Sequence, residues 1–453
     1  MNADSKRADV LLLAVCAAIS ALLCAAQILG SRAMIGVCLI GFMAAICFAA
    51  VKKKAFPVLL FFLPWSPLLK LSYSGISFYT IALIAVCLIA LVKSGFRFDA
   101  KSLITALMIL ALSLTVKVMA GSSITLDYIR FIFMLALFPM VVSGEMNGSD
   151  FRMSTLFLSI GIIIAGITAK YFAKYPNISR FIDVYSWSAV TRYSGYYGDA
   201  NFYSAQISAA LGGCLLLALS EKRSIDIALL FVPIILLTYC GFIAASKTFL
   251  LTFALMLFVW LFALMLSRQR PLFKAVTMLF IVIGVVIVFC TDLFSDSVAV
   301  IKLRFRQSTD FTSLTTHRDV LWLRYYEAIT GDYKLLLLGQ GLTKSLVHGS
   351  ASHNTIIQIV FQLGIIGGCM LFVWMLNYYK LLITSRPRRG SLLAVLALGI
   401  GIFLPWLSID LLMFDEFFLM PVYFCMAFDW LEASQNQPRS SLPPLGVPQR
   451  LQM

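Results

Sequence analysis

Charged side chains are scarce in this sequence, at 13% of its 453 residues, and histidine occurs only three times. The chain contains no Gly-x-x-x-x-Gly-Lys phosphate loop, no dinucleotide-binding glycine fingerprint, no His-Glu-x-x-His helix and no cysteine–histidine metal spacing. These absences argue against nucleotide-driven transport and zinc-dependent hydrolysis. No Asp-x-Asp pair lies in a predicted external segment, so we do not expect a divalent cation held beside a sugar nucleotide.

Apolar residues are abundant, at 61% of the chain, and the mean hydropathy is +0.92. A water-soluble domain with one core does not have this composition, so we predict a polytopic membrane protein. The net charge of +15 does not indicate nucleic-acid binding, because Lys and Arg are dispersed between apolar segments. The ten cysteines lie in or at the edges of apolar segments, which is typical of small buried side chains and not of disulfides or a zinc site.

Apolar segments of spanning length recur along the chain. A membrane-spanning helix needs about 20 mostly apolar residues, and by this measure the sequence offers about fourteen candidates. They lie near residues 8–28, 33–51, 55–70, 76–93, 101–119, 124–143, 152–172, 199–219, 226–244, 248–266, 272–290, 353–380, 391–409 and 411–432. The third contains Pro57, Pro64 and Pro67, so we expect it to be kinked or re-entrant. Counted with the fourth as one hairpin, it lowers the number of spans to about twelve. We therefore predict an all-α protein with about 12–14 transmembrane helices.

The distribution of Lys and Arg predicts the orientation of these spans, because cytoplasmic loops carry more of both. With a cytoplasmic N-terminus, the inside connections hold clusters such as Lys52-Lys53-Lys54 and Lys222-Arg223, while the short outside connections hold at most one basic residue each. The predicted divisions are spans in 1–172, an external loop at 173–198, spans in 199–290, a long external loop at 291–352 with amphipathic helices, spans in 353–433 and a disordered cytoplasmic tail at 434–453.

The end of the long loop concentrates unusual residues. It contains Gly-Gln-Gly at 339–341, then His353 and Asn354, and then an apolar helix with glycine at 364, 367 and 368. A titratable imidazole at the boundary of water and lipid can reach a polar head group while the helix behind it fixes its position. This pattern resembles the O-antigen ligase and O-antigen polymerase family of bacterial membrane glycosyltransferases.

The first external loop carries a second part of the resemblance. Arg192-x-x-Gly195, followed by Asp199-x-Asn201 at a helix start, is similar to the family's pattern, although Ala200 stands where the family usually has Pro. Asp199 or Asn201 can cap the helix, whose positive end then faces outward beside Arg192. We predict an anion site here, since a guanidinium fork suits phosphate oxygens. The alternative is an interfacial Arg that extends to lipid head groups.

The long loop also carries a predicted amphipathic helix. Thr316 and Asp319 form a capping-box-like start, and Arg318, Trp322 and Tyr325 share one face, which Ile329 continues. We expect this helix to lie on the membrane surface. An Arg near its start with aromatic residues behind it resembles the family's segment before Gly-x-Gly, which implies that Arg318 is a second phosphate ligand.

Further positions take their roles from the resemblance. Gly339 and Gly341 match the family's Gly-x-Gly, and with Asn354 they are assigned to the substrate site. Lys247 stands where the family usually has Arg. An ammonium binds phosphate as a point charge without the bidentate fork, so Lys247 is a weaker candidate ligand.

Arg130 and three acidic residues remain to be explained. Arg130 lies about one turn inside the outer boundary, where Asp127 at i−3 can neutralise it. We favour a structural role for Arg130 and retain substrate binding as the alternative. Asp410, Asp415 and Glu416 lie at the outer end of the last two spans, where they can orient an acceptor sugar, but capping or packing is the interpretation that we favour.

The resemblance implies a bacterial inner-membrane enzyme of glycosyltransferase-C-like build that works on the external face without a cofactor or metal. The donor is a polyprenyl-pyrophosphate-linked glycan, Arg192, Arg318 and Lys247 stabilise the departing pyrophosphate, and His353 is the general base for the acceptor hydroxyl. Membrane lipid and a chain-length regulator or flippase are the implied partners. We favour a polymerase, whose acceptor is another lipid-linked repeat, over a ligase that transfers the glycan to lipid A core. The alternative of another class is a flippase or transporter of lipid-linked sugars, whose polar groups would lie near the membrane midplane.

Overall fold

The structure is a computed structural model. It describes residues 3–71, 77–96, 99–119, 126–144, 150–182, 184–187, 190–220, 224–267, 271–290, 317–342, 349–382 and 389–436, together with several single residues between 269 and 347. Beyond residue 436, the predicted tail lies outside the described residues.

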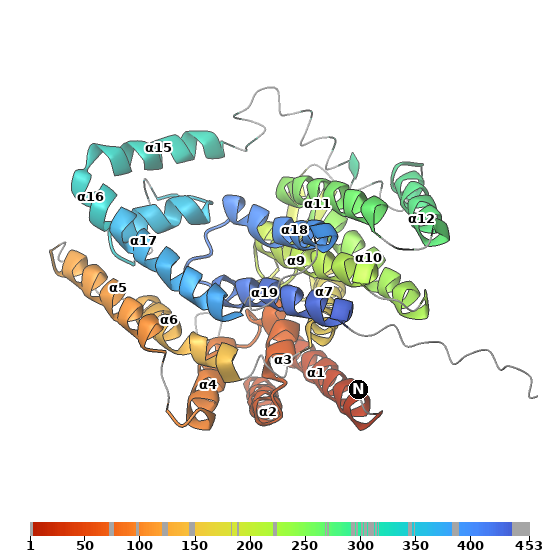
Figure 1. Ribbon diagram of the computed structural model, residues 1–453, viewed down its shortest axis with the longest axis horizontal. Helices are drawn as coiled ribbons and strands as arrows, with labels where there is room; N and C mark the ends of the chain where they lie inside the picture. The colour runs from red at the N-terminus through yellow and green to blue at the C-terminus, as the bar shows by residue number, and fades with distance from the viewer. Residues whose placement is uncertain are drawn as a thin grey trace, which may run out of the picture.

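Nearly all of the described chain is helical (Figure 1). The first half contains α1 (Ala3–Leu29), α2 (Arg32–Val51), α3 (Ala55–Phe62), the 3₁₀ helix η1 (Leu63–Trp65), α4 (Phe78–Lys93), α5 (Ala100–Met119), α6 (Leu126–Gly144), α7 (Phe151–Phe172) and α8 (Pro176–Ser179). The second half contains the strands β1 (Val184–Trp187) and β2 (Val190–Tyr193), then α9 (Ala200–Ser220), α10 (Ser224–Ala244), α11 (Lys247–Leu266), α12 (Pro271–Cys290), α15 (Arg318–Gly331), α16 (Tyr333–Leu338), α17 (Thr355–Leu382), α18 (Arg389–Phe403), the 3₁₀ helix η4 (Leu404–Ser408) and α19 (Glu416–Asn436).

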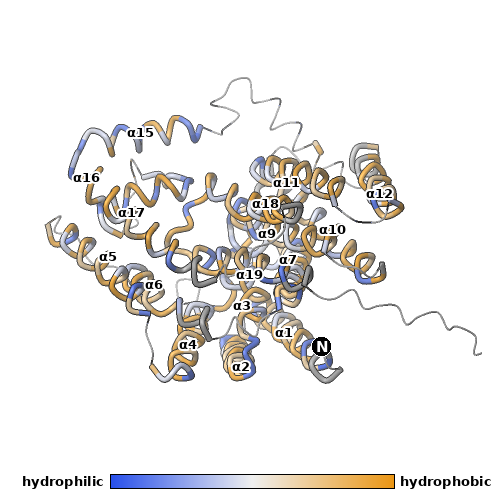
Figure 2. Tube along the Cα trace, viewed as in Figure 1, coloured by the Kyte–Doolittle hydropathy of each residue, from blue (hydrophilic) through white to orange (hydrophobic). Residues whose placement is uncertain are grey.

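Eight helices in the described ranges are long and apolar enough to cross a membrane, and five shorter apolar helices accompany them. Apolar residues extend along most of the helices (Figure 2). The chain is therefore an all-helical, multi-pass membrane protein, as predicted. The predicted count of 12–14 spans exceeds the eight because several segments, such as those of α3 and α4, form helices shorter than a full span.

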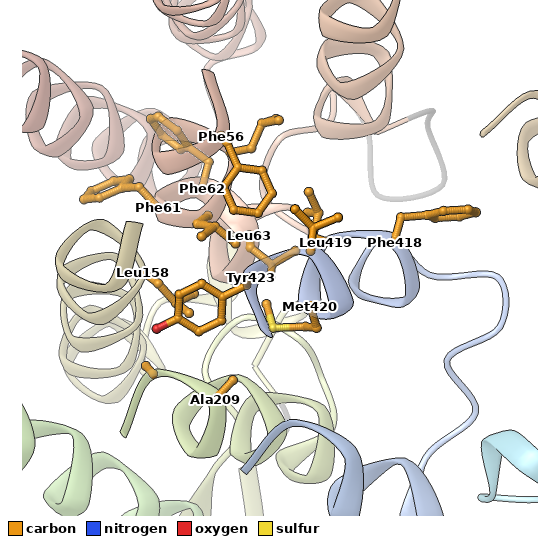
Figure 3. Packing of buried hydrophobic residues seen from close by; sticks show 14 of the residues in the cluster. Phe56, Phe61, Phe62, Leu63, Leu158, Ala209, Phe418, Leu419, Met420 and Tyr423 are labelled. Carbon is orange, nitrogen blue, oxygen red and sulfur yellow. The ribbon is translucent and has the colours of Figure 1, made fainter. Parts of the chain in front are cut away.

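The third predicted span is broken, as its prolines indicate. α3 has eight residues, all buried, and it passes into η1, where Pro64 stands in the first turn. A Cβ atom added at Gly161 would lie 2.2 Å from the carbonyl oxygen of Phe61, so α3 and α7 pack backbone to backbone. Trp65 donates from Nε1 to the Gly161 carbonyl at 3.1 Å. Irregular backbone at membrane depth is tolerated where protein surrounds it, and α3 meets this condition (Figure 3).

Figure 3 shows how the core is built from segments far apart in the chain. Phe61, Phe62 and Leu63 of α3 and η1 belong to the same buried cluster as Leu419 and Tyr423 of α19. The other centre of packing is α9, which contacts α7, α10, α11 and α18 and has most of its residues buried. These two centres are built from short or central helices that meet protein on every side.

A short hairpin in the first predicted external loop departs from the all-helical prediction. Val184–Trp187 pairs antiparallel with Val190–Tyr193, with Tyr185 opposite Arg192. Both strands are rich in β-branched and aromatic residues, which favour a pleated strand. Each strand has only four residues, so the pattern is too short to be distinguished from loop by periodicity.

Candidate functional site

The loop between η4 and α19 holds the start of α17 in place. The Asp410 carboxylate accepts a hydrogen bond from the Ser352 hydroxyl, one from the His353 backbone N–H at 3.1 Å and one from the Asn354 N–H at 3.0 Å. Carboxylate acceptors make stronger hydrogen bonds than neutral ones. Asp410 therefore fixes the backbone of His353. The half-buried imidazole makes no hydrogen bond within the described residues, so both of its ring nitrogens are available to a ligand.

Asn354 caps α17. Its side-chain oxygen accepts from the N–H groups of Ile356 at 2.9 Å and Ile357 at 3.3 Å, and the residue is 8% exposed. Thr355 also ties this turn to the 409–416 loop, donating to the Ile409 carbonyl at 2.7 Å. The Asn354 side-chain oxygen is used to cap the helix. The predicted binding of substrate by Asn354 therefore concerns its side-chain amino group.

His353 has a left-handed backbone, with φ of 48°. Glycine adopts this region readily, and asparagine, aspartate and histidine adopt it more often than other residues. Such conformations cluster at functional sites when the surrounding structure holds them in place. The hydrogen bonds from two consecutive N–H groups, at His353 and Asn354, to Asp410 compensate for the unfavourable conformation.

The glycines of the long loop explain how α16 crosses α17. Gly364 has φ of 65° and interrupts α17. The carbonyl groups that the break frees are used by the loop: the Gln340 N–H donates to Phe361 and the Gly341 N–H donates to Gln362, both at 2.9 Å. A Cβ atom on Gly339 would lie 2.4 Å from the Gly364 nitrogen, so two backbones meet here without side chains.

The predicted substrate-binding role of Gly339 and Gly341 is not supported by these contacts. The Gly339 N–H donates to the Leu335 carbonyl at 2.9 Å, and the Gly341 N–H is engaged with α17. A Cβ atom on Gly341 would meet Cγ of the buried Lys117 at 3.0 Å. The two glycines allow close packing of the long loop on the membrane helices.

The predicted face of the amphipathic helix exists in α15. Tyr325 and Ile329 are buried in a small apolar cluster with Phe361 of α17. Trp322 donates from Nε1 to the Ser352 carbonyl at 3.0 Å. Arg318 precedes Trp322 by four residues on the same face, so α15 brings Arg318 to within about one helical turn of the residue that contacts the His353 segment.

The start of α15 and the face that it buries both bear on the prediction. The helix begins at Arg318, with His317 in the N-cap position and no side-chain cap. Thr316, the predicted capping residue, lies outside the described residues. The face that we expected to meet the membrane packs on α17 instead. Other large side chains of α15 are exposed, among them Leu323 and Tyr326. These are the side chains of α15 that can contact a membrane surface.

Asp319 ties the helix start to the preceding loop. Its carboxylate accepts hydrogen bonds from the hydroxyls of Thr312 and Thr315, each at 2.6 Å. These bonds hold the pKa of Asp319 below its usual value. A carboxyl group with a lowered folded-state pKa stabilises the fold above its unfolded-state pKa, and that contribution is lost as pH falls through the folded-state value.

We therefore expect the start of α15 to loosen in acid. Hydrogen exchange of the first turn of α15 should increase as pH falls below the ordinary pKa range of aspartate, after correction for intrinsic exchange. In Asp319→Asn the first turn should be loosened at all pH values, and this acid-dependent step should disappear. An unchanged acid-dependent step in Asp319→Asn would assign it to another group.

The N-terminal ends of α9 and α11 lie next to each other. The Asp199 carboxylate accepts from the Asn201 N–H at 2.7 Å, which confirms Asp199 as the cap of α9. Ser246 caps α11 through the Phe249 N–H at 3.4 Å and donates to the Asn201 side-chain oxygen at 2.8 Å. Two helix N-termini, with Lys247 at the first position of α11, thus present their positive ends side by side, an arrangement that favours an anion.

Arg192 lies on β2, which contacts α7 and α10. The Arg192 side chain is outside the described residues, so its convergence with Arg318 on one anion site stays a prediction. A cation that sequence analysis missed lies at the end of α7: Lys170 donates to the Tyr239 hydroxyl of α10 at 2.7 Å. Lys170 lies on α7 and Tyr239 on α10, the two helices that β2 contacts. Lys170 therefore adds positive charge near the hairpin.

The segment 409–416 lies between the His353 segment and the N-terminal ends of α9 and α11. The ring of Phe414 lies 4.7 Å from that of Phe202, next to Asn201 at the start of α9. Tyr197, just before α9, donates to the Glu416 carboxylate. Between them, η4 contacts α9, α11 and α17. The His353 segment and the α9–α11 N-termini are therefore joined by one short stretch of chain.

Arg130 also binds this loop. Its guanidinium donates to the Met413 carbonyl and lies 3.9 Å from the Asp415 carboxylate. The Asp127 side chain that we expected to neutralise it lies outside the described residues. These contacts support the structural role for Arg130, and they give substrate binding no support.

The sequence suggested capping, packing or sugar orientation for Asp410. It did not reveal that the Asp410 carboxylate accepts a hydrogen bond from the His353 backbone N–H. The available signal was an acidic residue at the boundary of an apolar segment, where a charge is costly without a partner. That signal shows that a partner exists without identifying it.

The chain matches no known protein-family model, and no curated protein matches it. The family resemblance therefore rests on the motif residues themselves.

Proposed function

We propose that this protein is a glycosyltransferase-C-like membrane enzyme of the O-antigen polymerase and ligase type. In this proposal it joins polyprenyl-pyrophosphate-linked glycan repeats on the external face of a bacterial inner membrane. The observation that carries the proposal is the His353 segment. A half-buried imidazole stands on a backbone fixed by Asp410, with the Arg318 helix tied to the same segment through Trp322.

The proposal implies the following transfer chemistry. The acceptor hydroxyl oxygen forms a bond to the anomeric carbon as the bond from that carbon to the pyrophosphate oxygen breaks. His353 takes the hydroxyl proton. The bonding electrons leave with the lipid pyrophosphate, whose negative charge is stabilised by Arg192, Arg318, Lys247 and the N-termini of α9 and α11.

Purified protein with a lipid-linked repeat provides the direct test: the proposal requires longer lipid-linked glycans and released polyprenyl pyrophosphate. Transfer to lipid A core, with no lengthening of the lipid-linked donor, would identify a ligase. Translocation of the donor without a new glycosidic bond would identify a flippase. That second function is favoured by one observation, the buried carboxyl groups of Asp415 and Glu416, with Arg130 3.9 Å from Asp415. Ionisable residues within membrane proteins often mark transport pathways.

Arg318→Ala should weaken both donor binding and turnover, because a charge-assisted hydrogen bond acts in the ground state and the transition state. The loss of about 1.5–3 kcal/mol corresponds to roughly 10-fold to 150-fold in donor affinity. Arg324→Ala is the matched control, since Arg324 is exposed on the same helix. If both variants lose affinity equally, Arg318 is not a specific phosphate ligand.

The external face can be tested by labelling cells with a membrane-impermeant thiol reagent, after replacement of the exposed Cys290 and Cys369. Lys174→Cys and Thr330→Cys should react from outside, since both positions are exposed in the predicted external loops. Lys52→Cys, in a predicted cytoplasmic cluster, should react only after permeabilisation. The reverse pattern would invert the topology and exclude an external site.

A further inference from the structure

A small pocket lies between α9, η4 and the 409–416 segment. Its volume is about 10 Å³, close to the space for one water molecule, and its lining is mostly apolar. Its lining includes Phe202, Gln206, Trp406, Ile409, Leu411 and Glu416. Gln206 and Glu416 supply its polar groups, and neither has a part in the proposed transfer reaction.

Glu416 and Gln206 form an incompletely bonded pair. Tyr197 and the Gln206 amino group, the latter at 2.9 Å, both donate to Oε1 of Glu416. Oε2 of Glu416 and Oε1 of Gln206 accept no hydrogen bond from any described residue. The two residues are 4% and 1% exposed. Two buried acceptors in one pair therefore lack a donor, which is costly unless a ligand supplies one.

The surrounding charges do not neutralise Glu416. The titratable groups that face it are Asp415, which directly precedes it, Tyr197 before α9 and Tyr79 of α4. Arg130 of α6 is nearest to Asp415, at 3.9 Å. Asp415 also accepts from the Thr80 hydroxyl at 3.2 Å. The Arg130 guanidinium is thus paired with Asp415 and not with Glu416.

We propose that Glu416 is a proton-binding site, with the proton on Oε2 and the Gln206 side-chain oxygen as its acceptor. A carboxylic acid and a primary amide can exchange two hydrogen bonds, and the amide-to-acid bond is already present in the structure. A single proton then gives both unpaired oxygens a partner and removes a buried charge. A metal cation fits less well, because hard cations take about six or more oxygen ligands and most of the pocket lining is apolar.

The site adjoins the region proposed for catalysis. Glu416 is the first residue of α19 and directly follows the loop in which Asp410 holds His353. Ile409 and Leu411, on either side of Asp410, line the pocket. Release of the proton would leave a carboxylate beside an amide oxygen, two acceptors that repel each other. The 409–416 loop would then change its packing, so the proton can influence the position of His353.

Infrared spectroscopy of the purified protein tests the proposal without any assumption about activity. At neutral pH the spectrum should contain the C=O stretch of a protonated carboxylic acid. This band should be absent from Glu416→Gln and retained in the matched control Glu327→Gln, since Glu327 is exposed on α15. Retention of the whole band in folded Glu416→Gln, or its absence from the unsubstituted protein, would overturn the proposal.

A second variant covers the case in which Glu416→Gln does not fold. Gln206→Met keeps the carboxyl group and removes its acceptor, so the same band should move to higher frequency. An unmoved band would overturn the acid–amide pairing.

Thermal unfolding gives a further readout. The folded protein binds one more proton than the unfolded chain, so its unfolding temperature should fall, relative to that of folded Glu416→Gln protein, as pH rises from about 5 to about 8. An unfolding temperature that responds to sodium in place of choline, but not to pH, would assign the site to a metal cation and overturn the proton assignment.

Discussion

Replacement of His353 by Asn should reduce glycan transfer by about 100-fold to 10,000-fold, the range expected for loss of a general base. Asparagine is the appropriate substitute because His353 has φ of 48°, a conformation that Asn tolerates and Ala does not favour. The hydrogen bond to Asp410 comes from the backbone of residue 353, so it survives the change. Donor binding should stay nearly intact, because the proposed phosphate ligands are elsewhere.

The measurement is turnover and donor affinity of purified protein, with His317→Asn as the matched control. His317 also has a left-handed backbone, with φ of 62°, and is exposed before α15. Its replacement should change turnover little. Near-normal turnover in His353→Asn would show that His353 positions the segment and does not remove a proton.

Replacement of Gly339 by Ala should destabilise the long loop severely. The new Cβ atom would lie 2.4 Å from the Gly364 nitrogen and 2.5 Å from the Gln362 carbonyl oxygen, and backbone atoms cannot move aside as flexible side chains can. Gly339 has φ of 73° and ψ of −176°, a conformation essentially restricted to glycine, so an alanine there is strained by about 1–3 kcal/mol. Overpacking adds roughly 1–3 kcal/mol. The total should appear as a lower unfolding temperature and as loss of hydrogen-exchange protection in α16 and the middle of α17.

Gly349→Ala separates the two causes. Gly349 has a similar φ of 76°, but a Cβ atom there would meet nothing within 4 Å. This variant should show only the conformational part of the loss. Equal destabilisation by the two substitutions would mean that the crossing of α16 and α17 adjusts, and that Gly339 is required for its φ alone.

The sequence predicts the helical membrane architecture well because long apolar segments carry a strong, local signal. The break after α3 follows from Pro64, and the buried face of α15 follows from the spacing of Trp322, Tyr325 and Ile329. These features depend on residues within a few turns of one another, which a periodic pattern can report.

The candidate site is less predictable because it depends on contacts between distant residues. Nothing in the sequence pairs Asp410 with His353, or Gln340 with the Phe361 carbonyl that the break at Gly364 exposes. The resemblance directs attention to the His353–Asn354 segment. It does not indicate that Asn354 caps α17 or that Gly339 and Gly341 serve packing.

The hydrogen bond from His353 to Asp410 spans 57 residues, and this separation affects how the protein is made. His353 leaves the ribosome well before Asp410, because α17 and α18 are both synthesised between them. The helix start that carries His353 therefore remains without its carboxylate partner until the final part of the chain is inserted. Biogenesis thus completes the proposed active site last, and a chain that ends before Asp410 would retain most of its spans but lack an ordered His353.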